Sequence, residues 1–129
     1  MVPHQQHLRR LTGDEAESRE LACRWAREWV DRLATQTRPR ALLQARRLLV
    51  ACLAAAGRVE EAKSTLATIA AQCAPLGMVQ YLTDGGPGVI ATMAQLQTDK
   101  QAGRWPSEWP DVPADFLDRV VNAGAVQRI

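Results

Sequence analysis

Hydrophobic and polar residues alternate along most of this chain with the period of α-helices. The clearest segment begins after Gly13 and extends to about Thr35, where hydrophobic residues recur every three or four positions and charged residues fill the positions between them. The hydrophobic positions are Leu21, Ala22, Trp25, Ala26, Trp29, Val30 and Leu33. They share one face of the predicted helix, so we expect Trp25 and Trp29 to pack as core against the next helix rather than form an aromatic platform for a ligand.

Glycine and proline residues mark the ends of the other predicted helices. Pro39 can open a second helix, and Gly57 can end it in a left-handed conformation before a third helix begins. Residues 78–82 form a short hydrophobic run whose length fits a strand or a buried helical turn, and the helical surroundings favour the turn. Gly124 should end the last helix. The helices predicted in this way span about 14–35, 40–56, 58–74, 89–101 and 114–122.

The composition supports a single all-α domain. The chain has 129 residues, the usual size of one domain, and its 47% of hydrophobic residues are mostly Ala and Leu, with only 5% aromatic residues. A β-sandwich or barrel would need more β-branched and aromatic residues. We therefore expect antiparallel helix pairs, with a flexible lead-in at 1–13, a helical domain at 14–103, and a Pro/Trp segment with a short C-terminal helix at 104–129.

Charge and cysteine content argue against several classes of function. The 16 basic and 14 acidic residues give a net charge of +2, too balanced for an obligate nucleic-acid-binding protein, although the N-terminal half is the more basic one. Cys23, Cys52 and Cys73 lie in hydrophobic helical stretches, which suits reduced, buried thiols, and the ligand spacing of a zinc site is missing. No Ser or Cys has a nearby histidine base, so we expect no enzyme activity and no cofactor.

Nothing in the sequence predicts association with a membrane. No hydrophobic run reaches the ~18 residues of a membrane span, and the first ten residues lack the hydrophobic middle of a signal peptide. We therefore expect a cytoplasmic protein without a membrane partner.

Residues 43–76 match one period of a tetratricopeptide repeat, which is about 34 residues long. Gly57 falls where such a repeat turns between its two helices, and Ala62 is small enough to let the second helix lie close against the first. The seam between these helices is expected to be filled by Leu49, Leu53, Leu66 and Ile69. This pattern predicts tetratricopeptide-like helix pairs of the α-solenoid type.

The residues from Cys73 to Ile90 carry a more specific pattern, in which a helix ends at Pro75 and Gly77 and an Asp-Gly loop precedes another hydrophobic helix. This pattern resembles the end of the helical-repeat domain in MalT-like regulators, the large ATP-dependent branch of the LuxR family. The resemblance covers about residues 21–97, and Gly86 departs from the family pattern. The matching positions are Asp84, Gly85, Pro87, Val89 and Ile90.

The resemblance implies one part of a three-part transcriptional regulator. In that family a nucleotide-switching domain precedes a superhelix of tetratricopeptide-like repeats, which senses an effector or partner, and a helix-turn-helix follows. Only the middle part is expected here, because the chain has no phosphate-binding Gly-x-x-x-x-Gly-Lys-Ser/Thr loop and no helix-turn-helix signature after Gln97. DNA would then be contacted only through a domain absent from this chain.

The inner face of such a repeat is lined mainly by its first helix, which makes this face the candidate site for an effector or a partner protein. The candidate contacts on this helix are Gln44, Arg47, Ala51 and Ala54. A different hypothesis is a stand-alone helical adaptor whose Trp105 and Trp109 grip a partner protein, although both indoles could dock on their own chain. Weak nucleic-acid binding through the basic N-terminal half is a third hypothesis. An exposed repeat edge would also allow a homodimer.

Overall fold

The computed structural model describes residues 4–36 and 38–127, with side chains at 15–36 and 38–125, and this part of the chain is all-helical, without a strand. The α-helices are α1 (His4–Ala34), α2 (Pro39–Ala55), α3 (Val59–Cys73), α4 (Val79–Thr83), α5 (Pro87–Gln101) and α6 (Ala114–Gln127). A short 3-10 turn, η1 (Ala74–Leu76), follows α3. The all-α class is therefore confirmed, and α4 stands at the place of the predicted helical turn.

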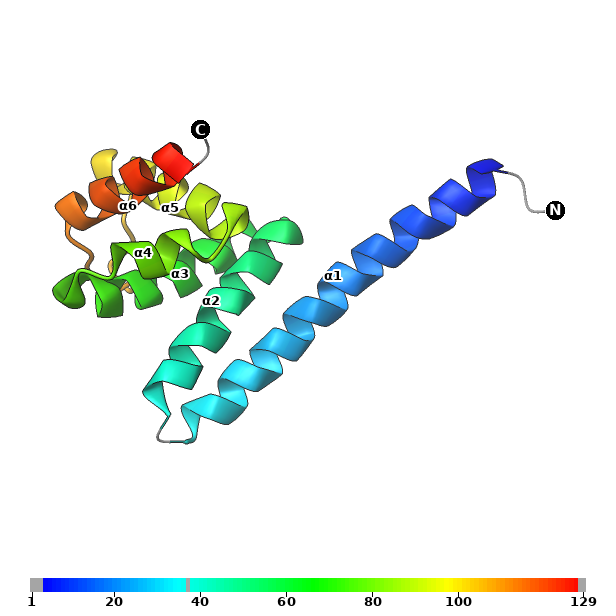
Figure 1. Ribbon diagram of the computed structural model, residues 1–129, viewed down its shortest axis with the longest axis horizontal. Helices are drawn as coiled ribbons and strands as arrows, with labels where there is room; N and C mark the ends of the chain where they lie inside the picture. The colour runs from blue at the N-terminus through cyan, green and yellow to red at the C-terminus, as the bar shows by residue number, and fades with distance from the viewer. Residues whose placement is uncertain (1–3, 37, 128–129) are drawn as a thin grey trace.

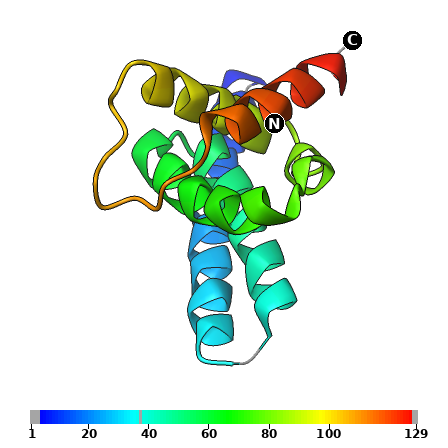
Figure 2. The ribbon, with the colours of Figure 1, turned by 90° about the vertical axis from the view of Figure 1, so that its left-hand side faces the viewer.

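The helices pack as neighbouring pairs around α2. α1 and α2 form a hairpin, α3 and α5 also contact α2, and α6 packs on α4 and α5 (Figure 1). The view turned by 90° shows the closed end of the α1–α2 hairpin extending below the compact group of α3 to α6 (Figure 2). The N-terminal half of α1 projects away from that group, so its C-terminal half makes the contacts with the rest of the chain.

The hydrophobic core lies between α2, α3, α5 and α6. Leu53, Leu66 and Ile69 are fully buried and Leu49 is nearly so, which confirms the predicted seam between α2 and α3. Each such side chain stabilises the fold by about 1.5–3 kcal/mol relative to an exposed position. The core continues through α5 and α6 with the buried side chains of Val89, Met93, Leu96, Phe116, Leu117 and Val120.

The turn between α2 and α3 depends on Gly57. Its φ of +77° lies in the left-handed region, which glycine adopts without a steric penalty. The backbone N–H of Gly57 donates to the Ala54 carbonyl, and that of Arg58 donates to the Leu53 carbonyl, 3.1 and 2.9 Å away. This pair of hydrogen bonds satisfies the last carbonyls of α2 and is the Schellman termination that glycine favours. The predicted stop at Gly57 is confirmed.

Two predicted helix ends differ from the structure. α1 begins at His4, so residues 4–13 are part of the helix and not a lead-in outside it. Gln, Leu and Arg are good helix formers, and one Gly inside a helix costs only about 1 kcal/mol. α6 passes through Gly124 and ends at Gln127. Gly124 is buried there because its missing side chain lets α6 approach Ile90 on α5.

The prediction that Trp25 and Trp29 pack as core against α2 is wrong. Their side chains are 57% and 39% exposed, whereas Cys23, Ala26 and Leu33 are buried in the α1–α2 seam. The seam positions are small or unbranched at Cβ, which lets the two helices approach closely. Trp25 and Trp29 fall on the neighbouring side of α1, outside that seam.

The Pro/Trp segment between α5 and α6 packs on the helices of its own chain. Val112 is fully buried, and Trp105 and Trp109 are half-buried against the core.

Cys23, Cys52 and Cys73 are free thiols, and burial raises the pKa of each. Within the described residues, no helix combines the length and the hydrophobicity that a membrane crossing requires.

Candidate functional site on α2

The four candidate residues of α2 lie along one side of the helix, because their spacing is that of successive helical turns. The structure divides them between different environments. Gln44 is exposed, whereas Arg47 is partly buried beneath the segment that connects α4 to α5, and Ala51 and Ala54 are partly buried beneath the first turn of α5. The four residues therefore share one side of α2, as predicted, but they do not form one open surface, because only Gln44 is exposed.

Arg47 makes its contacts within the chain. Its Nη1 donates a hydrogen bond to the Tyr81 carbonyl oxygen at 2.7 Å, and its guanidinium lies 4.2 Å from the centroid of the Tyr81 ring. Gly85 leaves room for the stem of this side chain, since a Cβ at Gly85 would come within 3.1 Å of it. Arg47 thus connects α2 to α4, and an anionic ligand would have to compete with these contacts.

Ala51 and Ala54 allow the first turn of α5 to approach α2. A Cβ at Gly88 would lie 3.3 Å from the Ala54 Cβ, which is tighter than ordinary van der Waals contact. The two alanines also line a pocket of about 430 Å³, which we call the α2–α5 pocket, together with Ala62, Thr92 and other residues of α3 and α5. The small side chains of Ala51 and Ala54 therefore allow close packing of α5 on α2, and the α2–α5 pocket is a shallow opening next to this contact.

A larger pocket, of about 550 Å³, lies between the N-terminal half of α2 and the η1–α4 segment, and we call it the α2–α4 pocket. Its lining is mainly hydrophobic. The lining residues are Pro39, Arg40, Leu42, Leu43, Gln44, Gln72, Leu76, Met78 and Tyr81. Gln44 is the one sequence-predicted contact that lines it, while Gln72, Met78 and Tyr81 were not anticipated.

Tyr81 links the α2–α4 pocket to the buried contacts of Arg47. Tyr81 is one of the lining residues, and its hydroxyl is buried without a hydrogen-bond partner among the described residues. Burial raises the pKa of the Tyr81 phenol, and the positive charge of Arg47 partly offsets that rise. A buried hydroxyl without a partner costs free energy, so a small movement that gives it one would be favourable.

Trp105 and Trp109 face each other edge to face, with ring centroids 5.5 Å apart and an interplanar angle of 85°. The Trp105 Nε1–H donates to the Pro110 carbonyl at 3.2 Å, and the Lys100 ammonium lies 4.9 Å from the Trp105 ring centroid. These contacts lie within the chain. The two indoles line neither the α2–α4 pocket nor the α2–α5 pocket.

A charge cluster centred on the buried Asp99 holds α3, α5 and the following segment together, and no sequence pattern predicts it. Lys63 Nζ lies 2.8 Å from Asp99 Oδ2, and Arg104 Nη2 lies 3.2 Å from Asp99 Oδ1. The hydrogen bond from Lys63, and secondarily that from Arg104, lowers the pKa of Asp99 although burial opposes the shift. Every group of the cluster is paired, so its arrangement suits a structural role.

The described residues contain no group of three or more His, Cys, Asp or Glu side chains that could hold a metal ion. The hydrophobic lining of the α2–α4 pocket suits an organic ligand better than an ion, because metal ions require charged or strongly polar donors.

Comparison with known proteins gives a partial similarity. No protein-family model and no solved structure matches this chain. Over 79 residues, or 61% of its length, the chain is 37% identical to the serine/threonine-protein kinase PknK of Mycobacterium tuberculosis and to that of Mycobacterium bovis. The matched segment is 7% of each of those proteins, so the chain is similar to a small part of a much longer protein.

Proposed function

We propose that this chain is an effector-binding helical domain that serves as the sensing part of a larger regulatory protein of the MalT-like, LuxR-family type. The α2–α4 pocket is the observation on which the proposal rests. Its volume of about 550 Å³ lies within the range of about 300–1,000 Å³ that is typical of small-molecule sites. The sequence resemblance across residues 21–97 supports the choice of a regulator.

The lining of the α2–α4 pocket suggests the chemistry of the effector. Leu42, Leu43 and Met78 offer a hydrophobic wall, and the exposed residues Gln44 and Gln72 add amide groups to the lining. Arg40 adds a positive charge at the same pocket. A small molecule with a hydrophobic body and one carboxylate or carbonyl group matches these residues best.

An occupant of this pocket would act on the packing of α2 against α4. The pocket is formed by both elements, and the Arg47–Tyr81 contacts join the same two elements through Tyr81, which lines it. A ligand that fits one spacing of these two helices better than another shifts the population toward that spacing. Neighbouring helices or domains that depend on the spacing would respond through the same free-energy difference.

The partial similarity to PknK is consistent with a domain that works within a longer polypeptide, since only 7% of that kinase is matched. Kinase activity is not part of the proposal. The sequence has no Gly-x-Gly-x-x-Gly loop, no His-Arg-Asp motif and no Asp-Phe-Gly motif, the elements with which protein kinases hold ATP and its metal ions.

Two-dimensional NMR on the isotope-labelled full chain tests the proposal, with a library of small aromatic and aliphatic carboxylates and amides as probes. Binding should perturb the side-chain amide signals of Gln44 and Gln72 and the methyl signal of Met78. Gln44→Ala and Leu76→Asp should weaken these perturbations, because both side chains line the pocket and are exposed. Gln95→Ala, in the α2–α5 pocket, is the matched control and should leave them unchanged. Perturbations that are absent, or that gather elsewhere, would refute the proposed site.

A further inference from the structure

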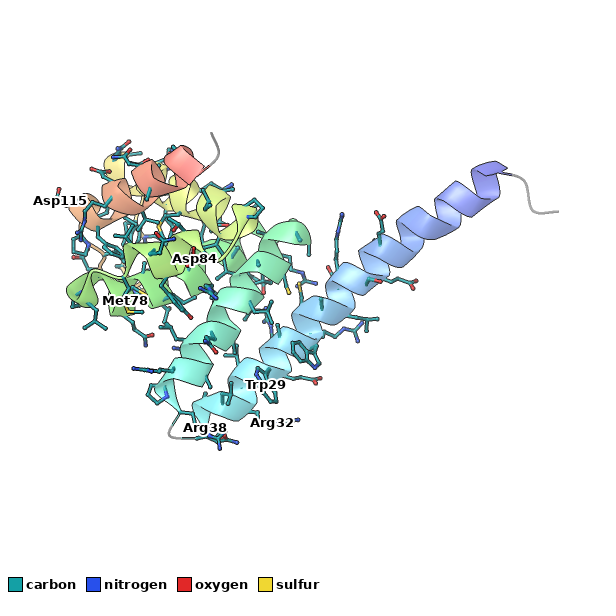
Figure 3. The ribbon with its side chains drawn as sticks, viewed as in Figure 1. Trp29, Arg32, Arg38, Met78, Asp84 and Asp115 are labelled. Atoms are coloured by element: carbon teal, nitrogen blue, oxygen red, sulfur yellow. The ribbon has the colours of Figure 1, made fainter. Side chains whose placement is uncertain are left out.

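The surface of α1 carries a hydrophobic stripe, formed by Leu21, Trp25 and Trp29, that no described residue covers. These side chains are 58%, 57% and 39% exposed. The indoles of Trp25 and Trp29 stack nearly parallel, with centroids 6.1 Å apart and an interplanar angle of 6°. Figure 3 places Trp29 and Arg32 on the C-terminal part of α1, where the Arg32 guanidinium lies 5.6 Å from the Trp29 ring. We call these three hydrophobic residues the α1 stripe.

The α1 stripe has the properties of an interaction surface. Single exposed hydrophobic residues are common on proteins, but contiguous hydrophobic patches mark binding sites, and Trp is the residue type most enriched at their energetic centres. The stripe lies outside the α1–α2 seam, which is made by Cys23, Ala26 and Leu33. A second helix can therefore lie along it without displacing α2.

We propose that the α1 stripe is the centre of an antiparallel interface between two copies of this chain, with the two-fold axis near Trp25. In an antiparallel helix pair, a residue before the axis faces the residue the same number of positions after it. Leu21 then faces the partner's Trp29, and the two copies of Trp25 meet at the axis. The hydrophobic residues of the stripe are thus complementary to themselves, as a two-fold interface requires.

Charges at the two ends of the stripe fit the same arrangement. Glu17 lies eight positions before Trp25 and Arg32 lies seven positions after it, so each Glu17 falls within one position of the partner's Arg32, close enough for these two long side chains to pair. Both side chains are exposed. Neither makes an ion pair with another residue whose side chain the structure describes. Opposite charges placed in this way favour the antiparallel register over a parallel one, which would bring like charges together.

The shape of α1 and the size of the stripe also suit a second copy. α1 has 31 residues and, at 1.5 Å of rise per residue, is about 46 Å long. Its N-terminal half projects free of the compact part of the chain (Figure 1). An aromatic side chain buries about 150–250 Å² when covered, so the exposed fractions of the two indoles leave roughly 150–250 Å² for each copy to bury. With Leu21 and a charged rim, this suits the centre of a small interface of about 1,000 Å² in total.

Sedimentation equilibrium of the full chain, from low to several hundred micromolar, tests the proposal. The wild-type chain should dimerise with a dissociation constant on the order of 10–100 µM. The Trp25→Ser, Trp29→Ser double variant should weaken dimerisation by at least roughly tenfold. Its thermal unfolding should change little, because both indoles are exposed. Leu76→Ser is the matched control, since Leu76 is 73% exposed and lies outside α1, and it should dimerise as the wild type does.

A charge exchange tests the antiparallel register. Glu17→Arg and Arg32→Glu should each weaken the dimer, because each places like charges opposite one another, and the chain that carries both changes should recover wild-type affinity. A wild-type chain that stays monomeric at several hundred micromolar would overturn the proposal. So would a dimer that is insensitive to the tryptophan changes, or a doubly exchanged chain that fails to recover.

Discussion

Arg47 fastens α2 to α4 through Tyr81, donating to its carbonyl oxygen at 2.7 Å and lying 4.2 Å from its ring centroid. Without this side chain, the partly buried carbonyl loses a charged donor and the ring loses its cation. We predict that Arg47→Ala lowers the free energy of unfolding by about 2 kcal/mol. Gln44→Ala, one turn away and exposed, should change it by less than about 0.5 kcal/mol. Urea denaturation of the two variants measures both effects.

Arg47→Lys provides the control for charge. An ammonium cannot hydrogen-bond the carbonyl and also stack as a plane on the ring, so this variant should recover only part of the lost stability. Full recovery would show that charge alone matters at this position. Equal losses in the Arg47 and Gln44 variants would contradict the structural role assigned to Arg47.

The difference between Arg47 and Gly57 shows how far the sequence predicts this structure. Gly57 acts through its own backbone conformation and the hydrogen bonds of the next residue, so a local pattern was enough to predict the turn. The partner of Arg47 lies 34 positions later in the chain. A helical pattern places Arg47 on one side of α2, but which element covers that side depends on how the chain returns, and no local signal specifies it.

Trp25 and Trp29 show a second limit of sequence reasoning. The hydrophobic residues of α1 occupy a broad arc, wide enough for two adjacent contact surfaces. Periodicity alone does not tell which part of such an arc faces the next helix. In the structure the smaller residues, such as Ala26 and Cys23, take the seam with α2, and the indoles are left outside.

Asp99 should be the most sensitive charged residue of the fold. It is only 8% exposed and pairs with both Lys63 and Arg104. Asp99→Ala leaves the partly buried Lys63 with only Glu60 as a partner, so we predict a loss of about 3 kcal/mol in the free energy of unfolding. Asp111→Ala, which removes the exposed partner of Lys100, should cost less than about 1 kcal/mol. Comparable losses in the two variants would show that burial does not strengthen the Asp99 cluster.

The Asp99 cluster also predicts a dependence of stability on pH. The hydrogen bond from Lys63 lowers the pKa of Asp99 below its ordinary value of 3.8 in the folded state. The folded chain therefore binds this proton more weakly than the unfolded chain does. The contribution of Asp99 is complete above the unfolded pKa and is lost as the pH falls through the folded one. The stability difference between the wild type and Asp99→Asn should shrink from pH 7 to pH 3 in urea denaturation. A constant difference would contradict the lowered pKa.

Trp105 and Trp109 distinguish a structural role from an adaptor role. They contact each other edge to face and lie against the core, so the Trp105→Ser, Trp109→Ser double variant should lose about 3 kcal/mol of stability. The matched change of the exposed Trp25 and Trp29 should cost much less. Thermal unfolding followed by circular dichroism compares the two. A Trp105 and Trp109 variant as stable as the wild type would instead favour the adaptor hypothesis, in which these indoles grip a partner protein.

Gly124 allows α6 to approach α5, and this reverses the usual effect of placing alanine in a helix. Alanine ordinarily stabilises a helix interior by about 1 kcal/mol relative to glycine. Here the added Cβ would lie 2.8 Å from the Ile90 Cγ2, so we predict that Gly124→Ala lowers the free energy of unfolding by about 1–2 kcal/mol. Ile90→Ala removes that methyl group, and in this background Gly124→Ala should become stabilising. A double-mutant cycle measures the coupling between the two positions. A cycle without coupling would mean that Gly124 is present for a reason other than the approach of α6 to Ile90.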